Sequence, residues 1–519
     1  MKEFIQKHAA AVIGILSGFD RVLFRGTLRA LMYEAGMMGY LSGANVRLTE
    51  FGRHAERVTN ELRTACEGVA ERAKRPVRYL ESPRVSKEDL ARQIASEDKI
   101  EKGLICVLKS VEPCLSYEVY RNSKEKLLQL RLKPRKCLHY YQYWMHPELG
   151  LMHARIQTWF PFTIHACVNG REWLARTLRR EGMGFEKREN CFTWLEDVPR
   201  AQALMNAQLR TDWCKLLNGL AAKLNPAHGQ IFKRCLLSYY WTAPQTEWAT
   251  DVMFKDAGSL QQVYPWLVRE AIAAFGAVDV LRFLGKRVAT ESYLARFSGE
   301  LTSDLKERPE GLRIRHALNG NSVKMYDKQG RLLRIETTLD NPRQFMVYRP
   351  KEGGSVDKKA WRILRNGVAD MYRRAEIGQA CNNRYLDKLA TIEQPQALKE
   401  CVAGICRPVQ WKGKRVRALT PWGQDAELLT VLLHGEYDLN GFRNRDLQKH
   451  LFAKPAADKN EARRRSSRVS RLLRLLRAHQ LIRKVSKTHR YVLTETGRLA
   501  LIALRAAHNA NIHKLLEAA

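Results

Sequence analysis

The stretch from Glu461 to Ala478 carries two superimposed patterns that leave few structural choices for this part of the chain. Apolar side chains recur there with the i, i+3, i+4, i+7 spacing of an amphipathic helix. These are Val469, Leu472, Leu473 and Leu476. Polar and basic side chains fill the opposite arc of the same predicted helix, namely Arg464, Ser467, Arg468, Arg471 and Arg474. One face is therefore expected to pack into a core, while the other presents guanidinium groups.

The segments around this helix are predicted to follow a definite order. A helix over Asp425–His434 and a second over Arg445–Leu451 precede it. Two short basic strands follow, with a turn at 486–488, and Thr494 is a natural N-cap for a last helix. This order, with the closing pattern Tyr-x-Leu-Thr-x-x-Gly at Tyr491–Gly497, resembles the MarR-like winged helix-turn-helix domains. The resemblance implies a DNA-binding winged helix over residues 421–519, with the third helix in the major groove.

Basic residues mark the surface that this resemblance assigns to DNA. Between Arg463 and Arg490 no acidic residue interrupts the run of Lys and Arg. Arginine can bind guanine edges or phosphates, and the sequence does not sort these roles. The candidate DNA-binding residues are Arg464, Ser467, Arg468, Arg471, Arg474, Arg483, Lys484, Lys487 and Arg490. The alternative is a protein-binding winged helix with a solvated arginine face.

Positive charge is not confined to this region. The 519 residues have a net charge of +35, and residues 421–519 hold 19 Lys and Arg against 9 Asp and Glu. Most of the excess therefore lies in the preceding body, which favours a polyanionic partner there too. DNA is the expected partner, and RNA is left open. No apolar run is long enough to span a membrane and no signal peptide is evident, so we expect a cytoplasmic protein without a membrane partner; a homo-oligomer is left open.

The body is expected to be α+β and to begin with an α/β domain over residues 1–120. The apolar run Val12–Leu16 and the following Ser17–Gly26 indicate strand, turn and strand. A helix is predicted over Leu48–Ala73 and a buried strand over Leu104–Leu108.

Three further segments complete the predicted α+β organisation. An aromatic-rich small β-sheet with a helix is expected over residues 121–200. Residues 201–395 form a helical region, with helices dominating 198–300, a three-strand meander at 311–342 and a basic helix at 358–389. The proline-containing stretch 396–420 is predicted to be a linker.

Three acids lie on or just after apolar, strand-like runs: Asp20, Asp251 and Glu336. The context of Asp20 resembles the first catalytic strand of RNase H-like transposases and nucleases. Phosphoryl transfer at DNA commonly uses divalent ions held by carboxylates, so these residues are candidate catalytic residues and ligands of Mg²⁺ or Mn²⁺. The alternatives are a turn or ion pair for Asp20 with Arg21 or Arg25, and a cross-strand pair for Glu336.

A second resemblance lies in the meander, where Lys324–Lys328 and Leu333–Glu336 resemble a stretch of phage and plasmid replication initiators. That family implies a nucleophilic tyrosine and a metal on a His-hydrophobe-His strand. The chain has no His-x-His, which puts this endonuclease function in doubt. The residues that could take part are Tyr326, Tyr140, Tyr141, His139, His146, His153 and His165. Packed or base-stacking aromatic residues are the alternative.

Other familiar chemistry has no sequence support. The chain contains no P-loop, and its eleven cysteines include no Cys-x-x-Cys pair, so neither a nucleotide cofactor nor a zinc site is indicated. The sequence predicts a DNA-binding protein of a mobile or extrachromosomal element, of the transposase, nuclease or replication-initiator kind. Whether it is an enzyme is left open. The alternative is a non-enzymatic transcriptional regulator or an RNA-binding protein.

Overall fold

A computed structural model describes residues 1–82, 84–286, 299–308, 311–351, 354–355, 357–391, 398–437, 441–486 and 488–510. These residues are mixed α and β, as predicted. They divide into two compact units. Unit 1 comprises Met1–Ala11, Asp256–Asp327 and Cys381–Ala519, and unit 2 comprises Val12–Lys255 and Lys328–Ala380.

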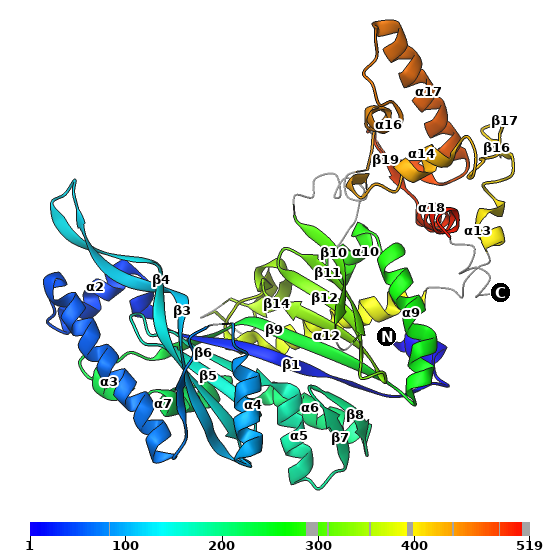
Figure 1. Cartoon of the computed structure of the whole chain (residues 1–519). Helices are drawn as coiled ribbons and strands as arrows, with labels where there is room; N and C mark the ends of the chain where they lie inside the picture. The colour runs from blue at the N-terminus through cyan, green and yellow to red at the C-terminus, as the bar shows by residue number, and fades with distance from the viewer. Residues whose placement is uncertain are drawn as a thin grey trace. The chain divides into compact units, whose positions relative to one another are not determined.

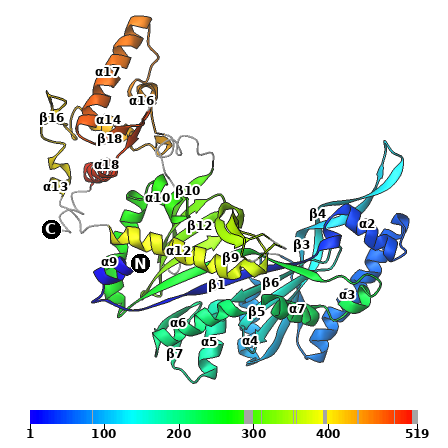
Figure 2. The same ribbon diagram turned by 180° about the vertical axis from the view of Figure 1, so that it is seen from behind.

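Unit 2 is built on a sheet in which the strand order is β13-β9-β1-β6-β5-β4-β3-β2. The bounds are β1 Val12–Leu28, β2 Val77–Tyr79, β3 Gly103–Asn122, β4 Leu127–His146, β5 Gly150–Gln157, β6 Ile164–Asn169, β9 Tyr239–Phe254 and β13 Leu332–Leu339. Neighbouring strands are antiparallel, except that β2 runs parallel to β3. The hairpin β3–β4 projects beyond the other strands (Figure 1 and Figure 2).

The two faces of this sheet are covered differently. One face carries the main apolar core, which packs against α2 (Glu34–Gly43), α3 (Phe51–Arg72) and α7 (Trp213–Leu224). The other face has separate apolar clusters at its two ends. The covering elements there are α4 (Lys87–Glu97), α5 (Gly170–Arg180), β7 (Phe185–Arg188), β8 (Cys191–Leu195) and α6 (Val198–Ala207). We call this second face the polar face, because charged and histidine side chains lie between the clusters.

Several predicted elements take a different form in unit 2. The predicted strand, turn and strand at Val12–Gly26 form one strand, β1. Irregularities in its pairing with β9 accommodate the turn-like residues. The predicted helical stretch 198–300 contains the sixteen-residue strand β9. Within the predicted basic helix 358–389, β15 (Lys359–Ile363) pairs with β14 (Met346–Pro350) before α12 begins at Met371 and runs to Ala390. The predicted boundaries at residues 120 and 200 do not coincide with the edges of a compact unit.

Unit 1 contains an antiparallel set of strands and a C-terminal helical cluster with its own core. Two of these strands, β11 (Gly311–Leu318) and β12 (Asn321–Lys328), match the first two strands of the predicted meander. β11 lies between β12 and β10 (Leu301–Arg308). Further helices are α1 (Lys2–Lys7), α9 (Ala257–Ala273) and α10 (Ala277–Phe283). The described residues contain no helix that is long and apolar enough to cross a membrane.

The C-terminal elements of unit 1 occur in the predicted order. They are α14 (Ala426–Val431), α16 (Asn444–Leu451), α17 (Lys459–Ala478), β18 (Ile482–Lys484), β19 (Tyr491–Leu493) and α18 (Glu495–His508). Part of the predicted linker 396–420 also packs here, as α13 (Leu398–Ala403), β16 (Val409–Trp411) and β17 (Lys414–Val416). Val402, Ile405 and Leu419 join the same apolar core as Leu473 and Leu476 of α17, so this segment belongs to the cluster instead of spanning a gap.

Candidate functional site

A β-bulge determines which side chains meet at the centre of the unit 2 sheet. Phe19 of β1 pairs with Trp248 of β9, whereas Val22 pairs with Thr246. Asp20 and Arg21 therefore lie opposite the single residue Glu247. Bulges of this kind bend a strand and redirect its side chains, and they are common next to active sites.

The bulge brings Asp20 close to two other carboxylates from neighbouring strands. Glu247 lies on β9 and Glu336 on β13. One carboxylate oxygen from each of Asp20, Glu247 and Glu336 lies within 4.8 Å of the others. The three residues are only 2%, 8% and 3% exposed. We call these three residues the carboxylate cluster. Arg21 has a half-exposed side chain and forms an ion pair with Glu247 at 3.2 Å, so it links the cluster to solvent.

Asp20 is fixed by donors from three different segments. Asn169 donates to its Oδ1 at 2.9 Å, and Asn190 donates to its Oδ2 at 2.7 Å. Arg334 donates to the same Oδ2 at 3.0 Å. The side-chain oxygen of Asn169 also caps α5 by accepting from the first backbone N–H groups of that helix. One asparagine therefore joins a helix N-terminus, where partial positive charge favours anions, to the carboxylate of Asp20.

Close packing of α5 on β1 requires a glycine. A Cβ on Gly170 would lie 2.2 Å from the carbonyl oxygen of Phe19, so only glycine fits without moving the backbone. This approach allows Arg171, which is fully buried, to donate to the carbonyl oxygens of Phe19 and Ala249 at 3.0 and 3.2 Å. The helix is thus locked over the strands that supply Asp20 and Glu247.

Asp251 occupies a different environment from the carboxylate cluster. It pairs in register with Arg334 across β9 and β13 and accepts from that guanidinium at 2.8 Å. Arg171 donates to it at 3.2 Å. Both arginines are fully buried, so their charges are compensated within the protein. Asp251 thus forms the centre of a buried ion-pair network with Arg171 and Arg334.

The two aspartates differ in the direction of their pKa shifts. Burial raises the pKa of Asp20; Arg334 and Arg171 oppose this, whereas Glu336 and Asp251 add to it. Burial also disfavours the charged form of Asp251, but Arg334 and Arg171 outweigh it and hold the pKa of Asp251 below its usual value. A buried carboxyl with a raised pKa beside other carboxylates is the setting in which a bound cation stabilises the charged form.

Sequence reasoning located two members of the carboxylate cluster and missed the third. Asp20 and Glu336 lie together, and Asp251 lies nearby in the ion-pair network. Glu247 was not selected, although it precedes Asp251 by four residues and so shares its face of a strand. That spacing was the available signal. Asp20 does form an ion pair, but its partner is Arg334 and not Arg21 or Arg25.

The tyrosines and histidines considered for a replication-initiator site are engaged in other contacts. Tyr140 donates to Glu67 at 2.6 Å, and Tyr141 donates to Glu112 at 2.7 Å. Burial raises the pKa of both phenols. His146 accepts two backbone N–H groups in the turn that follows β4. Tyr326 lies on β12 of unit 1. Within the described part of the chain, no group of three possible metal ligands includes these histidines.

Three buried or half-buried histidines on the polar face are expected to make the stability of the fold sensitive to acid. Burial, followed by the charge of Arg155, lowers the pKa of His139 and His153 to about 4 and that of His165 to about 3. The unfolded chain therefore takes up protons as pH falls from about 6.5 towards 4, while the folded chain does not, so stability decreases with acid. We expect His139→Gln to reduce this dependence by up to about 1.4 kcal/mol per pH unit. Urea unfolding at pH 7, 6 and 5 measures it; an unchanged slope would contradict the pKa assignment.

The candidate DNA-binding residues lie mainly on the exposed face of α17 and on the β18 strand. The exposed members are Arg464, Ser467, Arg468, Arg471, Arg474, Arg483 and Lys484, whereas Arg490 is half-buried. Lys487 lies outside the described residues. Arg474 is 5.7 Å from the ring centre of Trp411, so part of its charge is directed towards β16. Val469, Leu473 and Leu476 are buried, as the helical spacing predicts, whereas Leu472 of the same predicted face is half-buried.

No protein-family model, curated protein or solved structure matches this chain.

Proposed function

We propose that unit 2 carries a metal-dependent phosphoryl-transfer site that cuts or joins nucleic acid, and that the C-terminal elements form a winged helix that reads DNA. The convergence of Asp20, Glu247 and Glu336 on three adjacent strands carries this proposal. The three acids are far apart in the sequence and each lies on a different strand. Their proximity is therefore produced by the tertiary fold and not by neighbouring positions in the chain.

The carboxylate cluster has the donor chemistry that Mg²⁺ or Mn²⁺ requires. Both are hard cations that favour carboxylate oxygens, and Mg²⁺ binds them at about 2.0–2.1 Å. Three oxygens that already lie within 4.8 Å of one another can approach one ion with small side-chain adjustments. Bound there, a divalent ion would neutralise charge on a phosphate and lower the pKa of a coordinated water. The residues that would hold it are Asp20, Glu247 and Glu336.

The surrounding residues have positioning roles in this proposal. Asn169, Asn190 and Arg334 hold Asp20 in one orientation. Arg21 is the half-exposed group next to the cluster, and its guanidinium can bind a phosphate oxygen as a substrate approaches. The ion pair with Glu247 holds Arg21 in place until then.

Unit 2 also has a surface suited to holding a nucleic acid backbone. The hairpin β3–β4 projects from the sheet (Figure 1), and residues 121–136 contain seven Lys and Arg against one acid. Arg131, Lys133 and Arg135 all pair with the single carboxylate of Glu118. One negative charge therefore faces three positive charges, and the ribbon stays positively charged there. A two-stranded ribbon with this charge fits a nucleic acid groove.

The C-terminal elements support the DNA-reading half of the proposal. The helix order and the hairpin β18–β19 match the winged-helix expectation. Val469, Leu473 and Leu476 bury one side of α17 and leave Arg464, Arg468 and Arg471 exposed on another. A single exposed row of arginines on a helix is the arrangement that a major groove accepts.

Incubation of the full chain with duplex and single-stranded DNA, with Mg²⁺, Mn²⁺ or EDTA, tests the catalytic half of the proposal. We expect metal-dependent nicking or joining, with none in EDTA. Metal-independent cleavage, or none on any DNA, would refute that half and leave the regulator alternative. Activity on RNA alone would instead show that RNA, and not DNA, is the substrate.

For DNA reading, we predict that Arg468→Ala combined with Arg471→Ala weakens duplex binding by at least about tenfold, since each arginine contact is worth about 1–3 kcal/mol. The slope of log affinity against log salt should fall by about one unit for each of the two arginines that contacts a phosphate. Fluorescence anisotropy of the full chain at several salt concentrations measures both quantities.

A matched control removes the same charge from the same cluster at another position. Arg498→Ala combined with Arg505→Ala, on α18, should change duplex affinity much less than the α17 pair. Equal losses in the two double variants would show that net charge, and not the α17 face, determines binding.

A further inference from the structure

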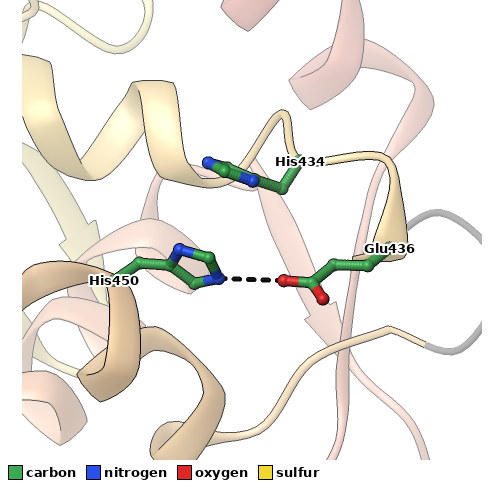
Figure 3. A group of neighbouring side chains, drawn as sticks. All are labelled: His434, Glu436 and His450. Carbon is green, nitrogen blue, oxygen red and sulfur yellow. Dashed lines mark hydrogen bonds and ion pairs between the residues drawn. The ribbon is translucent and has the colours of Figure 1, made fainter.

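A second group of possible metal ligands lies among the C-terminal elements and has no part in the proposed function. His434 follows α14, Glu436 follows two residues later, and His450 is near the end of α16. One ligand atom from each of the three lies within 4.8 Å of the others. Figure 3 shows both imidazoles and the carboxylate around a common space, with the His450–Glu436 hydrogen bond drawn.

The distances are close to those of a first coordination sphere. His450 Nε2 and Glu436 Oε1 are 2.9 Å apart, and the rings of His434 and His450 are 4.5 Å apart between centroids. Ligands of tetrahedral zinc lie at about 2.0–2.2 Å from the ion, which places them about 3.3 Å from each other. To hold an ion, His450 and Glu436 would separate by a few tenths of an ångström, and all three ligand atoms, which lie within 4.8 Å of one another, would adjust around it.

The side chains are supported by the core behind them. His450 contacts the ring of Tyr437 edge-on at 5.9 Å, and Tyr437 packs on Phe442 at 5.1 Å. Both aromatic residues are buried, so they restrain the orientation of the His450 ring. The three candidate ligands themselves are exposed, which gives an ion access from solvent.

From this geometry we infer that His434, Glu436 and His450 form a Zn²⁺ site, with a water completing the tetrahedron. Two imidazoles and one carboxylate suit Zn²⁺ and exclude Mg²⁺, which prefers oxygen ligands alone. No zinc site is indicated by the sequence at these positions, because they contain neither a cysteine pair nor a His-x-x-x-His spacing.

The site would join two segments that support α17. Zn²⁺ would tie the segment after α14 to α16. Asn444, at the start of α16, donates to the Ser466 carbonyl and to the Ser470 hydroxyl of α17, both at 2.9 Å. Zn²⁺ would therefore stabilise the arrangement of α16 against α17 without contacting a DNA ligand itself.

Zn²⁺ titration of the full chain, reduced and stripped of metal, against a chromophoric chelator tests the inference. We expect His434→Gln and His450→Gln each to weaken one Zn²⁺ equivalent by at least tenfold. Glu436→Gln, which keeps the hydrogen-bond acceptor but removes the charge, should weaken the same equivalent. His508→Gln, an exposed histidine of α18, is the matched control and should leave the affinity unchanged.

Two further measurements separate ligand loss from misfolding. In EDTA the melting temperatures of the wild type and both histidine variants should agree, and Zn²⁺ should raise only that of the wild type. Co²⁺ in place of Zn²⁺ should give visible absorption bands that are lost in the variants. Equal Zn²⁺ affinity in the wild type and both histidine variants would overturn the site, and so would an equal response to Mg²⁺.

Discussion

Asp20→Asn and Glu336→Gln are each expected to abolish metal-dependent cleavage or joining of DNA, with losses of at least about 100-fold. Even residues that only orient metal ligands cost about 10–100-fold when replaced, so loss of a ligand should cost more. Both substitutions preserve size and remove charge from the carboxylate cluster. Initial rates on the preferred DNA substrate, over a range of Mg²⁺ and Mn²⁺ concentrations, give the measurement.

The choice between Glu247 and Asp251 as the third ligand can be decided in the same assay. Glu247→Gln should reduce activity as strongly as the other two substitutions and shift the metal requirement to higher concentration. Asp251→Asn should act mainly on stability, because Asp251 lies between Arg171 and Arg334. Glu186→Gln, at an exposed acid on β7, is the control expected to retain activity. Undiminished cleavage in both Asp20→Asn and Glu336→Gln would rule out the site.

Arg334→Met is expected to lower the free energy of unfolding by about 3–5 kcal/mol, the usual cost of removing one partner from a buried ion pair. The substitution leaves the carboxylates of Asp20 and Asp251 without the guanidinium that both contact. Urea unfolding at pH 7, followed by tryptophan fluorescence, measures the change. A loss below about 1 kcal/mol, the size typical of a surface pair, would contradict the network.

Two companion variants locate the origin of that loss. Arg188→Met removes an exposed arginine that pairs with Glu186, and it should cost less than about 1 kcal/mol. Arg334→Met combined with Asp251→Asn should recover part of the stability, because the charge of Asp251 is removed together with one of the two arginines that hold it. The contribution of Asp251 is present at neutral pH and lost in acid, since its pKa is lowered in the fold.

The sequence predicted best what depends on local periodicity. The spacing of Val469, Leu473 and Leu476 identified α17 and its buried face, and the helix over Leu48–Ala73 matches α3. Local signals failed where tertiary pairing decides the structure. Ser17–Asp20 have turn-like composition, yet pairing of Ser17, Gly18 and Phe19 with β9 holds this segment in a strand, which continues through a bulge.

The candidate site shows the same division. Asp20 and Glu336 could be found because acids on apolar strands are unusual and need an explanation. The spacing from Asp251 places Glu247 on the same face of its strand, but its meeting with Asp20 depends on the one-residue register shift between Phe19 and Val22, which no local pattern shows. Likewise, the pairing of Asp251 with Arg334 depends on β13 lying beside β9, which no local pattern specifies.

The contact between Asp20 and Arg334 spans 314 positions of the chain. A ribosome therefore adds 314 residues after Asp20 before Arg334 of the last strand of the proposed site, β13, can take its place beside β9. Until then, a growing chain has Asp20 and Glu247 but lacks both Glu336 and the guanidinium that holds Asp20. With the proposed activity, a chain that stops before Leu339 could not cut nucleic acid, so the topology itself would delay a potentially damaging reaction until β13 has been made.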